Sequence, residues 1–218
     1  MTDPFRQAVL GVLIGAALSC VPVGAAVAGE MEDAVLAEIN FARLHPQEYA
    51  QRLLLQPVSD WEGSLSQDNN AQDNGAYAEA IEFLLQQAPL PALESEDDLA
   101  SAALEHVAAQ GPSGEVGHDG PAGEPFHARL RRHGLVAQIA GENIAYGPNA
   151  AADVVRELII DSGVADRGHR RNIFYSAFDA VGVSCGPHRD YGVMCVMDFS
   201  GAAHQRPIQL ASVGSVPF

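Results

Sequence analysis

Residues 180–199 hold two strand-like runs that are apolar on both faces, and this pattern constrains the fold more than any other feature of the chain. In the second run, Val193 and Cys195 point to one side of the strand, whereas Met194 and Val196 point to the other. A strand that is apolar on both faces must be covered on both sides by other layers. The pattern therefore predicts an α+β protein, a three-layer α-β-α sandwich whose central sheet contains this hairpin.

The same hairpin suggests a cysteine pairing. Antiparallel pairing of Cys185 with Cys195 places Val183 opposite Met197 and leaves a short turn between the strands. A disulfide can form between strands at a closely spaced, non-hydrogen-bonded pair. The alternative is two reduced thiols in the core. Export would favour the disulfide, because thiols oxidise outside the cytosol.

The first 28 residues are typical of a secretory signal peptide. Residues 1–28 contain a basic residue, an apolar run and an Ala-x-Ala cleavage site that ends at Ala28. A membrane anchor and a lipoprotein site at Cys20 are the alternatives, and each of the three implies export. We expect a secreted or periplasmic protein without a stable membrane span after signal cleavage. Residues 29–218 would form a single domain, with a core over about 32–200 and a short C-terminal tail.

The charge of the chain excludes some partners. There are 12 basic residues, all arginine, against 28 acidic residues, which gives a net charge of −16. This acidity argues against nucleic acid and against anionic membrane surfaces, since both attract basic proteins. Metal ions and other cations remain compatible with it. The chain also lacks the HExxH, GxSxG, P-loop and GxGxxG motifs of common hydrolases and nucleotide-binding proteins.

Apolar spacing with a period near 3.6 residues predicts a series of helices. One of them, which Ser95 would cap together with Asp98, carries His106 on its apolar face, so we interpret His106 as a core histidine rather than a ligand. The predicted helices span 32–44, 46–54, 76–88, about 96–109, 124–133 and 150–162, with a surface loop at 57–75 and a strand at 136–145.

Four polar residues are candidates for a functional site: His118, Glu142, Asp161 and His169. His118 lies in a Gly/Pro-rich loop, Glu142 on the predicted strand, and His169 in a Gly-flanked turn. On the helical wheel of residues 150–162, Asp161 falls at the edge of the apolar face, further from solvent than Glu157. Two imidazoles can bind a divalent metal, and two carboxylates can orient them or act as a base on bound water. The alternative is four surface residues with only local hydrogen bonds.

Three stretches together, GHDG, AGENIAYG and GHRRNIF, followed by the closing hairpin, resemble the CAP superfamily, also called the SCP domain. This superfamily includes cysteine-rich secretory proteins, insect venom antigen 5 and plant pathogenesis-related class 1 proteins. The early segment EINFARLHPQEYA is similar to the family's opening helix, with Asn40 and Arg43 at its Asn-x-x-Arg pattern. The resemblance covers about residues 32–200 and implies an α-β-α sandwich with a cleft of two histidines and two acids.

The resemblance implies roles for the four candidates. His118 and His169 match the cleft histidines, and Glu142 matches the acid of the GEN motif. The second acid usually follows a tryptophan by three positions; here Leu158 takes the place of the tryptophan and Asp161 that of the acid. In some members the two histidines bind zinc, so zinc or another divalent metal bound by His118 and His169 is the implied cofactor. The missing multi-disulfide pattern indicates a bacterial-type member with one bridge.

Three functions are compatible with these features. The first is an exported binding module whose cleft holds a metal, a small ligand, a lipid or a peptide, and this is the function we expect. The second is a metal-assisted hydrolase with His169 or Glu142 as the base, although no serine or cysteine nucleophile lies beside these residues. The third is a structural exoprotein with a vestigial site. The family as a whole has no established catalytic activity, so the resemblance does not define an enzyme.

Overall fold

The computed structural model describes residues 23–55, 74–201 and 204–205. Most of the expected signal peptide, nearly all of the expected surface loop at 57–75 and the C-terminal tail lie outside the described residues. None of the helices in the described ranges is long and apolar enough to cross a membrane.

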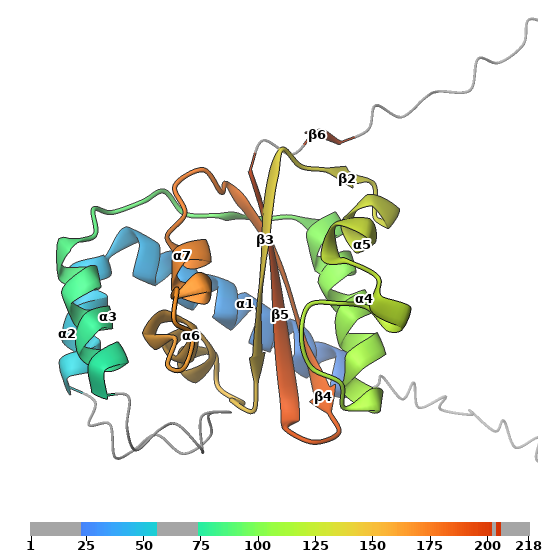
Figure 1. The fold of residues 1–218 in the computed structure, drawn as a ribbon, viewed down its shortest axis with the longest axis horizontal. Helices are drawn as coiled ribbons and strands as arrows, with labels where there is room; N and C mark the ends of the chain where they lie inside the picture. Colours follow the sequence, from blue (N-terminus) through green and yellow to red (C-terminus); the bar gives the residue numbers. More distant parts are fainter. Residues whose placement is uncertain (1–22, 56–73, 202–203, 206–218) are drawn as a thin grey trace, which may run out of the picture.

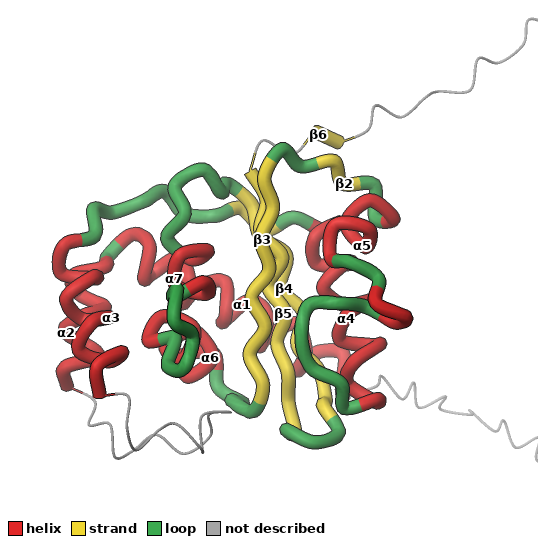
Figure 2. Tube along the Cα trace, viewed as in Figure 1, coloured by secondary structure: helices red, strands yellow, loops and turns green. Residues whose placement is uncertain are grey.

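A four-stranded sheet lies between two groups of helices, as Figure 1 and Figure 2 show. The strand order is β1-β4-β5-β3, with β1 (Glu94–Ser95), β4 (Ala180–His188), β5 (Gly192–Gly201) and β3 (Ile139–Tyr146). One face is covered by α1 (Val23–Leu44), α6 (Ala151–Ile160) and α7 (Gly168–Ile173), and α2 (Pro46–Leu55) and α3 (Asn74–Gln86) pack on the outside of these helices. The other face is covered by α4 (Asp97–Ser113) and α5 (Phe126–Arg132). The predicted three-layer α-β-α sandwich is confirmed.

Three short elements complete the described chain. A 3-10 turn, η3 (Pro121–Gly123), precedes α5, and β2 (Leu135–Val136) pairs antiparallel with β6 (His204–Gln205). This second small sheet lies beside the edge of the domain that α5 occupies (Figure 1).

The central strand β5 is buried on both faces, as its apolar pattern predicts. Cys195 and Met197 belong to the larger core, which also contains residues of α1, α2, α3 and α6. Met194 and Val196 face the other way and pack with Val107 of α4. All four β5 residues are at most 1% exposed, so neither face of the strand reaches solvent.

The closing hairpin has the predicted register. Cys185 pairs with Cys195 and Val183 with Met197. The two cysteines form a disulfide with their Cα atoms 4.1 Å apart. The backbone N–H of Cys185 donates to the Glu32 carboxylate at 2.8 Å, so it points away from β5. This is the arrangement of a non-hydrogen-bonded pair, whose backbone groups point away from each other.

The helix α4 packs directly on β4 because position 182 is glycine. A Cβ atom on Gly182 would lie 2.0 Å from the backbone nitrogen of Ala100. The predicted cap of this helix is wrong: Glu96, not Ser95, accepts a hydrogen bond from the Leu99 amide, at 2.6 Å. Ser95 instead lies in β1, which pairs parallel with β4. Pairing with the sheet took precedence over the local capping signal.

Candidate functional site

His118 and Glu142 form the first of two histidine–carboxylate pairs. Glu142 lies on β3, and His118 lies in the loop between α4 and η3. The Nδ1 atom of His118 is 2.8 Å from Oε1 of Glu142. The histidine side chain is 53% exposed, whereas the glutamate side chain is 2% exposed. The pair therefore joins a buried acid to a histidine that solvent or a ligand can reach.

The loop that carries His118 is fastened through the residue before it. The amide of Gly117 donates to the Tyr146 hydroxyl at 2.9 Å. The carbonyl of Gly117 accepts from Nε2 of Gln110 at 2.7 Å and lies 2.9 Å from Nε2 of His106. These contacts hold the loop against α4 and β3, so His118 does not depend on Glu142 alone for its position.

Glu142 has a second partner, Arg129 of α5, which is 2% exposed and forms an ion pair with its Oε2. Arg129 also lies 2.8 Å from Nδ1 of His106. An arginine can only donate, so Nδ1 of His106 accepts, and Nε2 carries the hydrogen toward Gly117. Burial lowers the pKa of His106, and Arg129 lowers it further. His106 is thus a neutral core histidine, as its place on the apolar face predicts.

The hydrogen bond that His118 donates to Glu142 raises the pKa of His118, against the opposing effect of burial. Because a carboxylate accepts, Nδ1 of His118 carries the hydrogen of this bond. The other ring nitrogen, Nε2, is left to take a ligand when the ring is neutral.

His169 and Asp161 form the second pair. Asp161 follows α6 with a left-handed backbone, φ 57° and ψ 44°, a conformation that aspartate tolerates better than most residues. Its Oδ1 lies 2.7 Å from Nδ1 of His169, and its Oδ2 accepts from the backbone amides of His169 and Arg170 at 2.9 and 3.3 Å. The Asp161 side chain is 1% exposed and that of His169 is 25% exposed. As in the first pair, Nε2 of the histidine is left for a ligand.

The Gly-flanked turn predicted at His169 is the first turn of a short helix, α7, so His169 lies at a helix start and not in a helix interior. The Asp161 carboxylate binds two of the amides that a helix N-terminus leaves without intrahelical partners. Because residues 162–167 separate the acid from this helix, local spacing did not reveal the helix start. The helical-wheel prediction that Asp161 lies at the border of the core is consistent with its burial.

Two asparagines connect the pairs. The side chain of Asn143, the residue after Glu142, donates to the carbonyl of His169 at 3.0 Å. Asn172 of α7 donates to Oδ1 of Asn143 at 2.8 Å and to the carbonyl of Glu142 at 3.2 Å. A Cβ atom on Gly141 would lie 3.0 Å from the Asn172 side chain. The AGEN segment therefore packs α7 against β3 next to Glu142, the residue that is bonded to His118.

The Asn-x-x-Arg pattern of the opening helix has a structural role. Arg43 is fully buried and donates to the carbonyls of Pro91, Ile173 and Phe178 at 2.9, 2.6 and 3.3 Å. Burial lowers the pKa of its guanidinium. Asn40 exchanges two hydrogen bonds with the backbone of Leu93. These residues tie α1 to the segments that follow α3 and α7.

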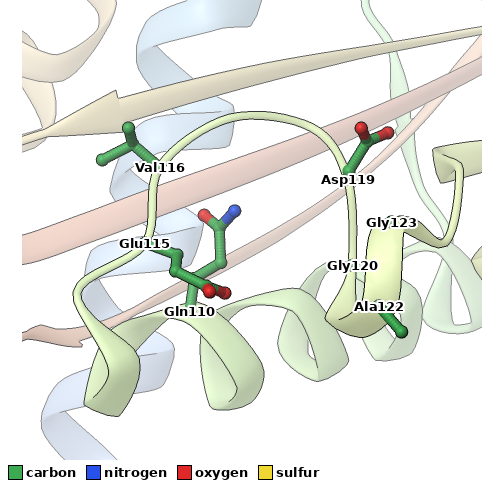
Figure 3. Close-up of a pocket in the computed structure, with 7 residues that line it drawn as sticks. All are labelled: Gln110, Glu115, Val116, Asp119, Gly120, Ala122 and Gly123. Atoms are coloured by element: carbon green, nitrogen blue, oxygen red, sulfur yellow. The ribbon is translucent and has the colours of Figure 1, made fainter.

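A shallow hollow of about 450 Å³ lies beside the His118 loop, as Figure 3 shows. None of the four predicted site residues lines it. The described residues also contain no group of three or more His, Cys, Asp or Glu side chains that could hold a metal ion. The hollow is lined by Gln110, Glu115, Val116, Asp119, Gly120, Ala122 and Gly123.

Sequence reasoning did not identify Arg129, Asn172 or Asp198, which surround the two pairs. Asn172 lies inside the GHRRNIF stretch, and that motif was the available signal for it. Arg129 stands in an amphipathic helix outside the matched motifs. Asp198 lies in the closing hairpin, which resembles the family without indicating a role for this acid. The roles of both follow from the packing of α5 and β5 against β3.

The fold and these contacts define an α-β-α sandwich that holds an exposed and a half-buried histidine, each on a buried acid, beside one strand. The profile of the CAP family, described as the cysteine-rich secretory protein family, matches residues 36–199. The chain therefore belongs to the CAP family. No curated protein matches the sequence.

Among solved structures, the chain is similar to three bacterial proteins. An extracellular protein containing an SCP domain from Bacillus anthracis is 25% identical with a TM-score of 0.43, covering 51% of this chain and 34% of its own. An outer surface protein from Borrelia burgdorferi is 18% identical with a TM-score of 0.43, covering 64% and 97%. A cysteine-rich secretory protein from Staphylococcus aureus is 16% identical with a TM-score of 0.37, covering 62% and 40%. The match thus spans about a third of the Bacillus anthracis chain.

Proposed function

We propose that this protein is an exported binding module whose His118 and His169 take a ligand through their Nε2 atoms. The observation that supports this most is the repeated arrangement of the two histidines. In each, Nδ1 is bonded to a carboxylate that is at most 2% exposed, while the ring itself is 25% exposed or more. Export rests on the signal-like residues 1–28, and the module would comprise residues 29–218.

A divalent transition metal such as zinc fits these donors. Zinc-binding histidines commonly donate their second ring N–H to a carboxylate, which orients the ring and makes the free nitrogen more basic. The acidic chain, with a net charge of −16, would also attract cations. Two protein ligands are fewer than the three of a typical catalytic zinc site, so we expect modest affinity, with other ligands completing the coordination. That the two rings converge on one ion stays a prediction.

The contacts of the carboxylates argue against Glu142 as the base of the alternative hydrolase and leave His169 as its other candidate base. A general base needs an oxygen free to take a proton from water. Glu142 has one oxygen on His118 and the other on Arg129. Asp161 has one oxygen on the ring of His169 and the other on two backbone amides. Both acids are therefore placed to orient the histidines rather than to accept a proton.

Zinc titration by calorimetry on untagged protein tests the proposal. We expect saturable binding in the wild type, at least tenfold weaker binding in His118→Ala and in His169→Ala, and none in the double variant. His127→Ala is the matched control, because His127 is an exposed histidine on α5 with no carboxylate partner among the described contacts. Unchanged binding in the double variant would remove the metal proposal.

Asp161→Asn and Glu142→Gln test the orienting role of the acids. Loss of such a partner commonly costs about 10–100-fold in metal affinity. Hydrolysis of a peptide library by the wild type, lost in His169→Ala, would instead support the hydrolase. Absence of both zinc binding and hydrolysis would favour the structural exoprotein.

A further inference from the structure

Two carboxyl groups share one buried arginine in the centre of the domain. Asp198 on β5 is paired with Glu142 on β3 in the antiparallel register, so the two residues lie directly opposite each other. Asp198 is fully buried, and the side chains of Glu142 and Arg129 are each 2% exposed. The cluster therefore holds two acids and one permanent cation away from solvent.

The contacts of Arg129 show which acid it neutralises. Arg129 forms an ion pair with Glu142, whereas its nearest nitrogen to Asp198 is 3.9 Å away, beyond hydrogen-bond distance. Neither oxygen of Asp198 accepts a hydrogen bond from any described residue. A buried carboxylate without donors is strongly disfavoured, because nothing replaces its hydration.

Within the described ranges of the chain, no cation besides Arg129 acts on Asp198. On the neighbouring strand β4 its register partner is Gly182, which has no side chain. On α4 the nearest titratable member of the cluster is His106, which is neutral with both ring nitrogens bonded. On the far side of Glu142, His118 bonds to Glu142 and not to Asp198. Arg129 thus forms its close ion pair with Glu142 and acts on Asp198 only from 3.9 Å.

We propose that Asp198 is a neutral carboxylic acid in the native protein and donates its proton in a hydrogen bond to Glu142. A carboxylate oxygen can accept more than one hydrogen bond, so Glu142 keeps its contacts with His118 and Arg129. Two facing carboxyl groups commonly share one proton, because both cannot ionise at short range. Asp198 is then a positioning residue, which fixes the acid that orients His118.

The electrostatics of the cluster support this protonation state. Burial raises the pKa of Asp198 well above its ordinary value, the neighbouring Glu142 raises it further, and Arg129 only partly opposes them. This inference does not depend on what the site binds. Failure of the Asp198 proposal would not affect the zinc proposal, and failure of the zinc proposal would not affect the Asp198 proposal.

The direct test is a carbon-13 NMR titration of side-chain carboxyl groups in the wild-type protein. The Asp198 carboxyl carbon is assigned through its own Cα and Cβ, and we expect the chemical shift of a protonated acid at pH 7. Asp190 is the internal control, since Arg189 lowers the pKa of this exposed acid, which should be ionised at the same pH. An ionised shift for Asp198 at pH 7 would overturn the proposal.

Asp198→Asn gives a second test, because the amide keeps the shape, stays neutral and can donate to Glu142. A raised pKa in the folded state stabilises the protein fully below the unfolded pKa of about 3.9, and this contribution is lost as pH rises toward the folded value. Between pH 5.5 and 7, the melting temperature of the wild type should therefore fall relative to that of Asp198→Asn. The expected slope is about 3–5 °C per pH unit.

Asp190→Asn is the matched variant and should show no such slope between pH 5.5 and 7, because the lowered pKa of Asp190 leaves this acid ionised in both the folded and the unfolded protein over that range. A wild type that gains stability relative to Asp198→Asn as pH rises would mean an ionised Asp198 paired with Arg129, and would refute the proposal. If Asp198→Asn does not fold, the wild-type NMR titration decides.

Discussion

Replacing Arg129 with methionine should destabilise the protein far more than the same change at Arg132. Both arginines lie on α5, and both pair with carboxylates. The Arg129 side chain is 2% exposed, whereas that of Arg132 is 43% exposed. Methionine keeps much of the apolar stem and removes the cation, so the comparison isolates the effect of burial on an ion pair.

The expected loss of stability follows from the carboxylate that each substitution leaves without its arginine. In Arg129→Met, Glu142 stays 2% exposed, loses its permanent cation and keeps the hydrogen bond that His118 donates. Removing one member of a buried pair costs about 3–5 kcal/mol, because the other charge is left uncompensated. For a domain of this size the loss corresponds to about 6–20 °C in melting temperature. Arg132→Met should cost about 0–1 kcal/mol, as exposed pairs do.

Denaturant unfolding at pH 7 measures both costs, and an NMR titration of His118 provides an independent reading. Arg129 lowers the pKa of His118, although the hydrogen bond to Glu142 is the larger influence and raises it. Arg129→Met should therefore raise the pKa of His118 further, while Arg132→Met should not. Equal costs for the two variants, or a lower His118 pKa in Arg129→Met, would refute the buried-pair argument.

Three further predictions concern the hairpin, the core and the first histidine pair. Replacing Cys185 and Cys195 together with serine should cost about 2–3 kcal/mol in chemical unfolding and leave a folded domain, because the closed loop is short. Leu158→Ala should cost about 2–5 kcal/mol, since Leu158 is 2% exposed and its loss opens a cavity; a cost below 1 kcal/mol would contradict its core assignment. His118→Gln should lower stability more at pH 5 than at pH 8, because the raised pKa of His118 gives a contribution that is full below pH 6.5 and lost as pH rises through the folded value. For the same reason, protons should begin to compete with zinc for His118 above pH 6.5. A stability difference between the wild type and His118→Gln that grows with pH would contradict the pairing of His118 with Glu142.

Much of the central sheet could be predicted because its signals are local. Alternation along 180–199 indicates which side chains share a face, and the short turn leaves one register that pairs Cys185 with Cys195. Once both faces are apolar, layers on both sides follow from the cost of exposing them. Helical periodicity likewise located α2, α3, α5 and α6 within a few residues.

Motifs also pointed to the histidines and acids, although they do not state what each acid contacts. The pairing of His118 with Glu142, and of His169 with Asp161, joins segments that are not periodic and depends on how α7 and the His118 loop pack on β3. The capping signal at Ser95 failed for a related reason, because that residue is held by β4 rather than by the helix that follows it.

The buried charges were decided by tertiary structure alone. An arginine on an amphipathic helix is usually solvated, and nothing near Arg129 in the sequence distinguishes it from Arg132. Asp198 sits in a strand whose neighbours predict only an apolar core. The register of β3 against β5 places Asp198 opposite Glu142, and the packing of α5 brings Arg129 to them. The ionisation of these groups depends on distances and burial between segments that are remote in the chain, and a local pattern of residues carries no information about either.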